Sequence, residues 1–420
     1  MTTDFLFLFD QTVSKDAFEE DVRKHKALFD HHTTILIRTS NVRSLFAAII
    51  AARDLQIALY VCPLIVLDFQ IQKLLHEWPI SLYLSEDNSI EFSQNVGTPS
   101  EPRLGIFTSG TLGEPKIALH KWEAIQTPSH FVPSYLHKKS WLLSYAPWSY
   151  AGLQVFFAAL NSQGSLYYDD NHFEQIAEGI LKHQISIISA TPTFWRMLIS
   201  TWPSHITPPK LLQATLGGEI VDQQTIDLVG AFFHPQRLTH IYASTETGSA
   251  IVVSDRDAGF PTSFLYQGEK SGAQLRINAE NELEVLAPHG MEGYLSAPNI
   301  HNTWIPTGDL VEIKQDRVYF VGRKDGRINS GGRKVSPEEI EQAINSLKDV
   351  EDSLVYARKS PIVGSLIVAD IKMRHSKIFD PAAIKQELKK ILEDYKIPHL
   401  IRRVDHFAIS SNGKKIRDLL

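Results

Sequence analysis

Strand-like and helix-like segments alternate through most of the chain. Helix-spaced apolar positions fall at 43–54, 152–161, 173–183 and 222–231. Short apolar runs typical of buried strands lie around them, at 35–37, 58–62, 141–145, 165–168, 186–190 and 239–243. Strands that alternate with helices predict parallel sheets covered by helices, and therefore an α/β fold.

The pattern changes from about residue 265 to residue 324. Here the strand patterns AQLRIN, NELEVLA and RVYFVG follow one another closely, without helices between them. Closely spaced strands predict a small antiparallel or barrel-like β subdomain. We expect residues 1–324 to form one large N-terminal domain that ends with this subdomain.

Residues 325–420 have the pattern of a separate small α+β domain. The stretch SPEEIEQAINSL predicts a helix with Ser336 as its cap, Pro337 in its first turn and Glu339 closing a capping box. The stretch DPAAIKQELKKILEDY predicts a second helix, capped by Asp380. The runs SLVYA and SLIVADI, which lie between the two helices, predict strands.

Composition narrows the class of protein. A chain of 420 residues is too long for one compact core, so two or three domains are expected. Its formal net charge of -6 gives no sign of a nucleic-acid partner, and its single cysteine, Cys62, excludes an intramolecular disulfide framework. No stretch approaches the roughly 20 apolar residues of a membrane span, and the N-terminal apolar run is too short for a signal peptide. We therefore predict a cytoplasmic protein with no membrane partner.

The stretch FTSGTLGEPK at 107–116 has the composition of an anion-binding loop. Its glycines allow a tight turn that exposes backbone N–H groups, its hydroxyls can donate hydrogen bonds, and its lysine can neutralise charge. It does not fit the Walker pattern, because a proline precedes the lysine and no Ser or Thr follows it. Alone, it suits a phosphate site and a polar surface turn equally. The candidate phosphate-binding residues are Thr108, Ser109, Gly110, Thr111, Gly113 and Lys116.

Four further motifs follow this loop in order along the chain. They are YASTETG at 242–248, TGDL at 307–310, GRKDGRINSGGRKVSPEEIE at 322–341 and NGKKIR at 412–417. Together with the loop they resemble the signature stretches of the adenylate-forming superfamily, which includes acyl-CoA and aryl-CoA ligases, luciferases and peptide-synthetase adenylation domains. The resemblance implies that the loop binds the triphosphate of ATP. Because the loop comes earlier than in most relatives, we expect an N-terminally shortened member with a complete active site.

The resemblance implies an AMP-forming acid–thiol ligase. Such an enzyme joins a carboxylic acid to AMP, releases pyrophosphate, and then passes the acyl group to a thiol. A carboxylate that attacks a phosphate meets like charge, so cations and fixed dipoles have to neutralise it. The implied cofactors are ATP, Mg²⁺ and CoA, and the implied partner is a small carboxylic acid.

The resemblance also implies a catalytic role for three residues. Thr245 would contact the α-phosphate, and Glu246 would hold Mg²⁺, which prefers oxygen ligands. Lys414 would stabilise charge during adenylation. The sequence departs from the usual family pattern at Leu112 and Ile117, so a slightly weaker hold on phosphate is expected.

Further motif residues are implied to bind the nucleotide and the thiol. Tyr242 would lie against adenine, near the glycine-rich turn that holds Gly218 and Glu219. Asp309 and Arg323 would bind the ribose. Asp325 would be the hinge about which a mobile C-terminal domain changes orientation. The thiol tunnel would be lined by Gly331 and Gly332.

The acid is expected to bind near APWSYAG at 146–152. The predicted pocket residues are Trp148, Tyr150 and Gly217, and a role as a core aromatic is the alternative for Tyr150. Two further aromatic residues, Phe194 and Trp195, are expected in the same wall. Aromatic lining favours an aromatic or a short to medium apolar acid.

Two alternatives to a CoA ligase stay open from the sequence. In the first, the acyl group would pass to an acyl carrier protein instead of CoA. Both acceptors carry their thiol at the end of the same phosphopantetheine arm. A non-catalytic nucleotide sensor is the other alternative. The presence of Lys414 argues against a sensor, because nucleotide binding alone does not need this lysine.

Overall fold

The chain divides into two compact units. The computed structural model describes residues 4–8, 11–85, 89–91, 101–108, 116–169, 175–267, 272–298, 303–330, 333–360, 364–374, 377–410 and 413–417. Unit 1 comprises Met1–Ser189, Ala243–Ala250 and Ala287–Thr303, and unit 2 comprises Ala190–Tyr242, Ile251–Leu286 and Trp304–Leu420. The predicted domain boundary between residues 324 and 325 lies inside unit 2 and stays a prediction.

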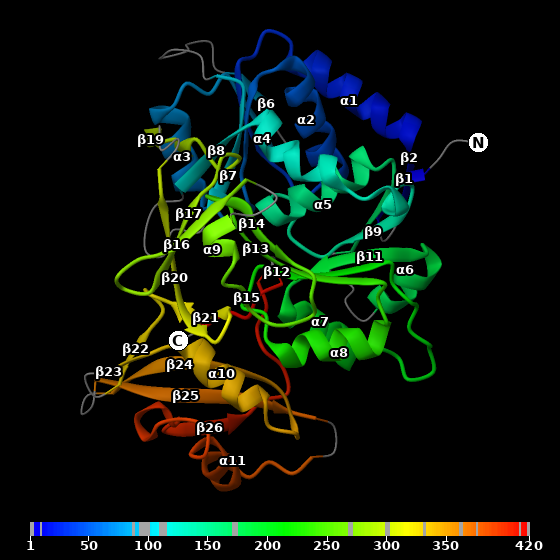
Figure 1. Ribbon diagram of the computed structural model, residues 1–420. Helices are drawn as coiled ribbons and strands as arrows, with labels where there is room; N and C mark the ends of the chain where they lie inside the picture. The colour runs from blue at the N-terminus through cyan, green and yellow to red at the C-terminus, as the bar shows by residue number, and fades with distance from the viewer. Residues whose placement is uncertain are drawn as a thin grey trace. The chain divides into compact units, whose positions relative to one another are not determined.

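Unit 1 contains five neighbouring strands in the order β11-β9-β10-β1-β2, of which β1, β2, β9 and β11 are labelled in Figure 1. All neighbours in this group are parallel except the antiparallel pair β1-β2. The N-terminal apolar run forms β1 beside β10, a strand that the sequence analysis did not predict. The bounds are β1 (Asp4–Leu8), β2 (Thr12–Ser14), β9 (Ser140–Leu143), β10 (Ser165–Tyr168) and β11 (Ile185–Ala190).

A second sheet of unit 1 has the order β19-β18-β8-β7-β4-β3-β5-β6. Its centre, β7-β4-β3-β5, is parallel, as the strand–helix alternation predicts, and antiparallel strands extend it on both sides. The bounds are β3 (Thr34–Arg38), β4 (Ala58–Val61), β5 (Leu82–Ser85), β6 (Ser89–Glu91), β7 (Arg103–Thr108), β8 (Lys116–Lys121), β18 (Gly293–Tyr294) and β19 (Ala297–Pro298).

Two helices of unit 1 pack against each other through aromatic rings. Phe46 of α2 stacks on Phe156 of α5 with a centroid distance of 4.0 Å. α2 begins after its cap Asn41, whose side chain accepts from Ser44 N–H, and its apolar residues make it buried on nearly all sides. The helices are α1 (Lys15–Phe29), α2 (Val42–Leu55), α3 (Asp68–Glu77), α4 (Trp122–Gln126), η1 (Thr127–Phe131), η2 (Ser134–Leu136), α5 (Tyr150–Asn161) and α6 (Ile176–Lys182).

Unit 2 begins with helices and parallel strands. β12 (Gln213–Gly217) and β13 (Arg237–Ser244) are parallel neighbours, and α7 (Pro192–Ser200) and α8 (Gln223–Phe233) accompany them. β14 (Gly248–Val253) follows β13 after a short turn, and its residues 251–253 belong to unit 2. Trp195 of α7 is fully buried: its Nε1 donates to the Thr215 carbonyl at 3.0 Å and its ring meets Phe233. Trp195 is thus a core residue, which corrects the expectation that it lines an acid pocket.

The predicted antiparallel subdomain is present in unit 2. Five strands have the order β15-β21-β20-β17-β16, and the pairings between them are antiparallel. The elements are β15 (Phe260–Pro261), α9 (Phe264–Gln267), β16 (Gln274–Ile277), β17 (Glu282–Leu286), β20 (Ile305–Lys314) and β21 (Arg317–Arg323).

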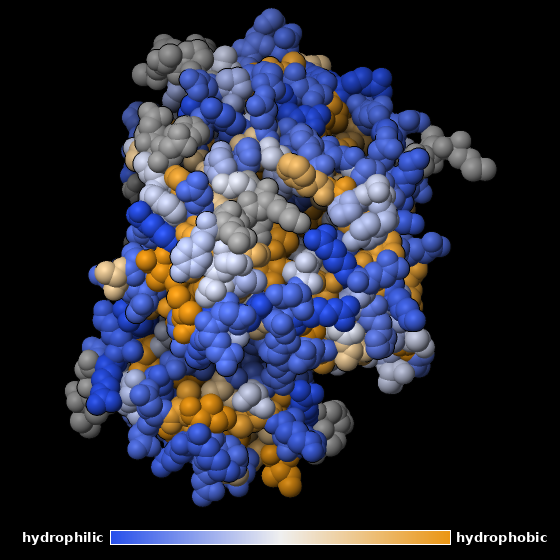
Figure 2. Space-filling view, in the orientation of Figure 1, coloured by the Kyte–Doolittle hydropathy of each residue, from blue (hydrophilic) through white to orange (hydrophobic). Residues whose placement is uncertain are grey.

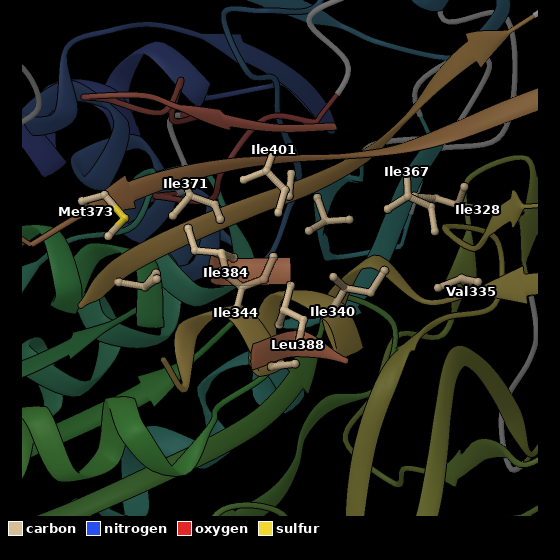
Figure 3. Close-up of a cluster of buried hydrophobic side chains, with 14 residues drawn as sticks. Ile328, Val335, Ile340, Ile344, Ile367, Ile371, Met373, Ile384, Leu388 and Ile401 are labelled. Atoms are coloured by element: carbon tan, nitrogen blue, oxygen red, sulfur yellow. The ribbon is translucent and has the colours of Figure 1, made fainter. Parts of the chain in front are cut away.

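The C-terminal part of unit 2 has its own apolar core. Ile367 and Ile371 from the sheet β24-β25-β26 point toward Ile340 and Ile344 of α10 and Leu388 of α11 (Figure 3). This arrangement matches the predicted α+β organisation. The elements are β22 (Ile328–Ser330), β23 (Arg333–Val335), α10 (Pro337–Asn345), β24 (Val350–Ser360), β25 (Gly364–Met373), α11 (Pro381–Leu388), η4 (Asp394–Lys396) and β26 (Leu400–Arg403).

The ends of the two C-terminal helices differ in part from the prediction. Ser336 and Asp380 are the caps of α10 and α11, and Asp380 accepts two backbone N–H bonds as predicted. Ser336 makes no side-chain capping bond, and Glu339 pairs with Lys396 at 2.6 Å. The predicted capping box is therefore wrong, because a tertiary ion pair engages the glutamate. α11 also ends at Leu388, earlier than its sequence pattern predicts.

Hydrophilic residues cover most of the surface in view, with hydrophobic residues between them (Figure 2). None of the helices in the described ranges has both the length and the apolar character that a bilayer crossing requires.

Two helical glycines differ in the space available for a side chain, so we expect alanine to have opposite effects on stability at the two positions. A Cβ at Gly230 of α8 would meet only a Leu238 methyl group at 3.9 Å, whereas one at Gly152 of α5 would overlap the Ala146 carbonyl oxygen. Gly230→Ala should stabilise the protein by up to about 1 kcal/mol through helix propensity. Gly152→Ala should destabilise it by about 1–3 kcal/mol. Chemical denaturation measures both, and a stabilised Gly152→Ala variant would contradict the tight contact between α5 and the residues before it.

Candidate functional site

The predicted phosphate loop joins two paired strands of unit 1. Thr108, the last residue of β7, is the Cα partner of Lys116, the first residue of β8. The antiparallel pairing therefore holds the two ends of the loop side by side. The predicted loop residues Ser109, Gly110, Thr111 and Gly113 lie outside the described residues.

Tyr294 connects two of the predicted site residues of unit 1. Its hydroxyl donates to Glu246 Oε1 at 2.9 Å, and the Lys116 ammonium lies 5.2 Å from the centre of its ring. β18 carries Tyr294 beside Ala118 of β8, which explains how the ring reaches Lys116. Burial and the neighbouring Glu246 carboxylate raise the pKa of Tyr294, so its hydroxyl stays protonated and can donate. Lys116, Glu246 and Tyr294 are the first cluster.

Glu246 suits the predicted role of a magnesium ligand. Its backbone is held by the Met291 N–H, which donates to the Glu246 carbonyl at 2.9 Å. Within the ranges that the structure describes, no three His, Cys, Asp or Glu side chains gather in a metal-binding group. Mg²⁺ typically takes one or two protein carboxylates and completes its shell with water and phosphate oxygens, so a single glutamate fits it.

Two buried side chains, His120 and Tyr150, contact the backbone in and just after the YASTETG motif. Burial lowers the pKa of His120 to about 4, against the opposing influence of the Thr245 backbone and Glu292, so the imidazole is neutral. Its ring lies 5.6 Å from that of Tyr150. The Tyr150 side chain is itself buried and bonds the Ser249 backbone. The structure therefore favours the core alternative for Tyr150, as a support for the motif turn.

The remaining pocket predictions are placed as follows. Trp148 is half-buried in the segment before α5, and Phe194 is buried in α7. Gly217 ends β12, and Gly218 follows with φ of +84°, a conformation that favours glycine. Glu219 accepts from the Thr193 backbone N–H at 3.0 Å, which ties this turn to α7.

Unit 2 brings together three residues that the sequence assigned to the nucleoside. The Tyr242 hydroxyl donates to Asp309 Oδ2 at 2.6 Å, and Arg323 Nη1 lies 3.5 Å from Asp309 Oδ1. Asp309 and Arg323 are Cα partners on β20 and β21. Phe320 stacks on the Tyr242 ring with a centroid distance of 4.7 Å. Tyr242, Asp309 and Arg323 are the second cluster.

The glycine of TGDL is needed for this arrangement. Gly308 has φ of +76°, and a Cβ there would approach the Arg323 guanidinium to 3.0 Å. A side chain at this position would therefore strain the backbone and displace Arg323 from Asp309.

Lys414 lies close enough to the second cluster to affect Asp309. Burial raises the pKa of Asp309, while the hydrogen bond from Tyr242 and the charges of Arg323 and Lys414 oppose this rise. Because burial and the Asp309 charge raise the pKa of Tyr242, that hydroxyl stays protonated. The two cations that oppose the rise in the Asp309 pKa thus come from motifs that are distant in sequence.

Asp325, the predicted hinge, and its neighbour Lys324 both form ion pairs in this conformation. Arg323 Nε lies 3.2 Å from Asp325 Oδ1, and Lys324 pairs with Glu282 at 3.0 Å and with Glu280. The predicted tunnel residues Gly331 and Gly332 lie outside the described residues.

Sequence reasoning missed Tyr294 and His120. Neither belongs to one of the motifs on which the site prediction was based. Tyr294 is 48 residues from Glu246, so only the strand pairing brings the two together. The only local signal was the position of His120 at the end of the apolar run that follows Lys116.

The family matches of this α/β chain define an enzyme of the adenylate-forming class. Residues 8–297 match the family described as AMP-binding enzyme, and residues 339–414 match the AMP-binding enzyme C-terminal domain. The chain belongs to the AMP-binding enzyme family. The predicted superfamily and the predicted enzyme class, an AMP-forming acid–thiol ligase, are thereby confirmed.

One similar protein is the 2-succinylbenzoate–CoA ligase of Listeria innocua. It is 28% identical over 341 residues, which cover 75% of this chain and 68% of that protein.

Two solved structures share the fold. The o-succinylbenzoate CoA synthetase MenE from Bacillus subtilis, in complex with ATP and a magnesium ion, has a TM-score of 0.71 at 18% identity, with 100% of this chain and 96% of that chain covered. ATP-bound MatB from Rhodopseudomonas palustris has a TM-score of 0.76 at 16% identity, with 98% and 94% covered. The predicted fold class is confirmed by this likeness.

Tyr294→Phe should raise the Mg²⁺ concentration needed for half-maximal activity by roughly tenfold, because Glu246 loses the hydroxyl that orients it. The measurement is pyrophosphate release as a function of Mg²⁺ at fixed ATP. Tyr266→Phe is the matched control, since Tyr266 is 83% exposed. The same Mg²⁺ dependence in Tyr294→Phe and wild type would show that the hydroxyl does not orient the carboxylate.

Proposed function

We propose that this chain activates an aromatic or a short to medium apolar carboxylic acid with ATP and transfers the acyl group to CoA. In the first half-reaction a carboxylate oxygen bonds to the α-phosphorus, and the bond to the β-phosphate breaks to release pyrophosphate. In the second, the thiol sulfur bonds to the acyl carbon, AMP leaves, and the thiol proton passes to solvent. Atoms and charges balance without an oxidant or reductant.

The observation that carries the proposal is the grouping of Tyr242, Asp309 and Arg323, with the charge of Lys414 acting on the same carboxylate. Asp309 and Arg323 suit a ribose, because the carboxylate accepts and the guanidinium donates hydrogen bonds. One face of the Tyr242 ring meets Phe320, and the other face is assigned to adenine. A nucleotide held by the second cluster would therefore lie within the influence of the Lys414 ammonium, as adenylation requires.

The first cluster suits the phosphates. Lys116 supplies positive charge, and Glu246 supplies the carboxylate for Mg²⁺, which would neutralise the phosphate oxygens. Thr245, next to Glu246, is assigned to the α-phosphate. Tyr294 orients the glutamate by a hydrogen bond.

The acid is proposed from the relatives and from the aromatic residues near α5. The relative from Listeria innocua is named for 2-succinylbenzoate and CoA, so aromatic carboxylates are the first class to test, with CoA as the first acceptor. Transfer to a carrier protein is an outcome that the same experiment separates.

An acid panel tests the proposal. The protein is incubated with ATP, Mg²⁺ and aromatic, short apolar, long-chain or amino acids, and pyrophosphate release is measured with CoA or a phosphopantetheinylated carrier protein. We expect the highest rate with an aromatic or a short to medium apolar acid, and thioester only with CoA. Thioester on the carrier protein alone would favour the alternative acceptor. ATP binding without pyrophosphate release from any acid would favour the sensor.

Lys414→Ala tests the proposed division of labour between the half-reactions. We expect this variant to lose acyl-adenylate formation by about 100-fold or more, since a positioned charge stabilises the transition state. It should still transfer the acyl group of a synthetic acyl-adenylate to CoA. Lys389→Ala removes the same charge from an exposed position of the C-terminal region and should change neither rate. Equal losses in both half-reactions of Lys414→Ala would contradict a role confined to adenylation.

A further inference from the structure

Asp352 is a buried carboxylate between two cations. Lys415 Nζ lies 2.8 Å and Arg196 Nε lies 3.3 Å from Asp352 Oδ1. The side chains are 8%, 11% and 6% exposed for Lys415, Arg196 and Asp352. Burial alone would raise the pKa of Asp352, but Arg196 and Lys415 lower it, so the carboxylate is ionised.

The two cations come from different parts of the chain. Arg196 is on α7, within the region 8–297 that matches the AMP-binding enzyme family. Asp352 is on β24, within the C-terminal match 339–414. Lys415 is the first residue after the end of that match. Asp352 is therefore shared between a cation of its own region and a cation of the preceding one.

Each side of this ion pair also has partners of its own. Arg196 Nη1 donates to Thr225 Oγ1 at 2.7 Å and lies 3.5 Å from Asp222, both near the start of α8. Lys415 pairs with Asp352 and donates to the Ser353 carbonyl. A break between Arg196 and Asp352 thus leaves neither charge unpaired, which removes most of the penalty for separating a buried ion pair.

A second bond links α7 to the same C-terminal segment. Thr191, the cap of α7, accepts from the Phe194 N–H at 3.0 Å and donates to the Gly413 carbonyl at 2.6 Å. Gly413 directly precedes Lys414. The two residues of α7 therefore hold the segment on both sides of this lysine, through Gly413 directly and through Lys415 by way of Asp352.

We propose that Thr191 and Arg196 form a latch that holds the C-terminal region in the orientation that presents Lys414 for adenylation. This rests on the proposed function, in which Lys414 acts only in the first half-reaction. Both are positioning residues, because Thr191 acts through the Gly413 carbonyl and Arg196 acts through Asp352 and the Lys415 side chain. The separate partners on each side let the latch open for thiol transfer at low cost.

The latch is tested with Arg196→Met and Thr191→Val, each measured in both half-reactions. Arg196→Met removes the charge but keeps much of the side-chain volume. We expect acyl-adenylate formation to fall about tenfold, a size typical of coupled contacts. Acyl transfer from a synthetic acyl-adenylate to CoA should stay unchanged or rise. Thr191→Ser keeps the hydroxyl and should restore adenylation.

Arg256→Met is the matched control. It makes the same substitution at an exposed arginine of unit 2, whose guanidinium donates to the Pro235 carbonyl at 3.1 Å. The ratio of the two half-reaction rates should stay at the wild-type value in this variant. Thermal unfolding of each variant confirms that it is folded. An equal fall in both half-reactions for Arg196→Met and Thr191→Val would overturn the latch.

Hydrogen exchange separates failure of the latch from failure of the proposed function. Amides of 413–417 should exchange faster in Arg196→Met and Thr191→Val than in wild type, and this measurement needs no substrate. Unchanged protection in both variants would overturn the latch even if the enzyme is active. Faster exchange in a protein that forms no acyl-adenylate would support the latch and reject the proposed function.

Discussion

The partly buried carboxylate of Asp309 and the buried carboxylate of Asp352 each gather charged or polar partners from distant parts of unit 2. A carboxylate removed from water has to be compensated by hydrogen bonds or cations. Asp309 obtains these from Tyr242 and Arg323, and Asp352 from Arg196 and Lys415. Neighbouring residues thus influence different carboxylates: the charge of Lys414 opposes the rise in the Asp309 pKa, and Lys415 pairs directly with Asp352. The ion pair of Lys415 with Asp352 helps to hold the C-terminal segment in place.

The local part of the fold was predictable from the sequence. The strand–helix alternation gave parallel sheets, and the closely spaced strands near residues 274–323 gave an antiparallel sheet, because both patterns depend on neighbouring residues. The pairing of β1 with β10 was not predictable, since a five-residue apolar run carries no information about its distant partner. The capping box failed for a similar reason, because the ion pair between Glu339 and Lys396 spans 57 residues.

The motifs predicted which residues would be grouped in the second cluster, but not the residues that hold the motif side chains in place. The motifs identified Asp309, Arg323 and Tyr242, and the structure brings these three together. The contact of Tyr294 with Glu246 and that of Arg196 with Asp352 join residues outside the motifs to distant partners. Such contacts arise from strand pairing and helix packing, which short motifs do not encode. Trp195 shows the converse, because an aromatic residue near a predicted pocket belongs to the core.

The discontinuity of unit 1 has a consequence for its synthesis. Its main segment ends at Ser189, but Glu246 and Tyr294 belong to two later segments, and β18 pairs with β8 at Gly293 and Tyr294. On the ribosome, the sheet edge of β8 therefore stays open while more than a hundred further residues are made. An open edge strand can pair with other chains. The edge is covered only when the last segment of unit 1 has emerged from the ribosome. A chaperone that binds open edge strands would protect the chain until then.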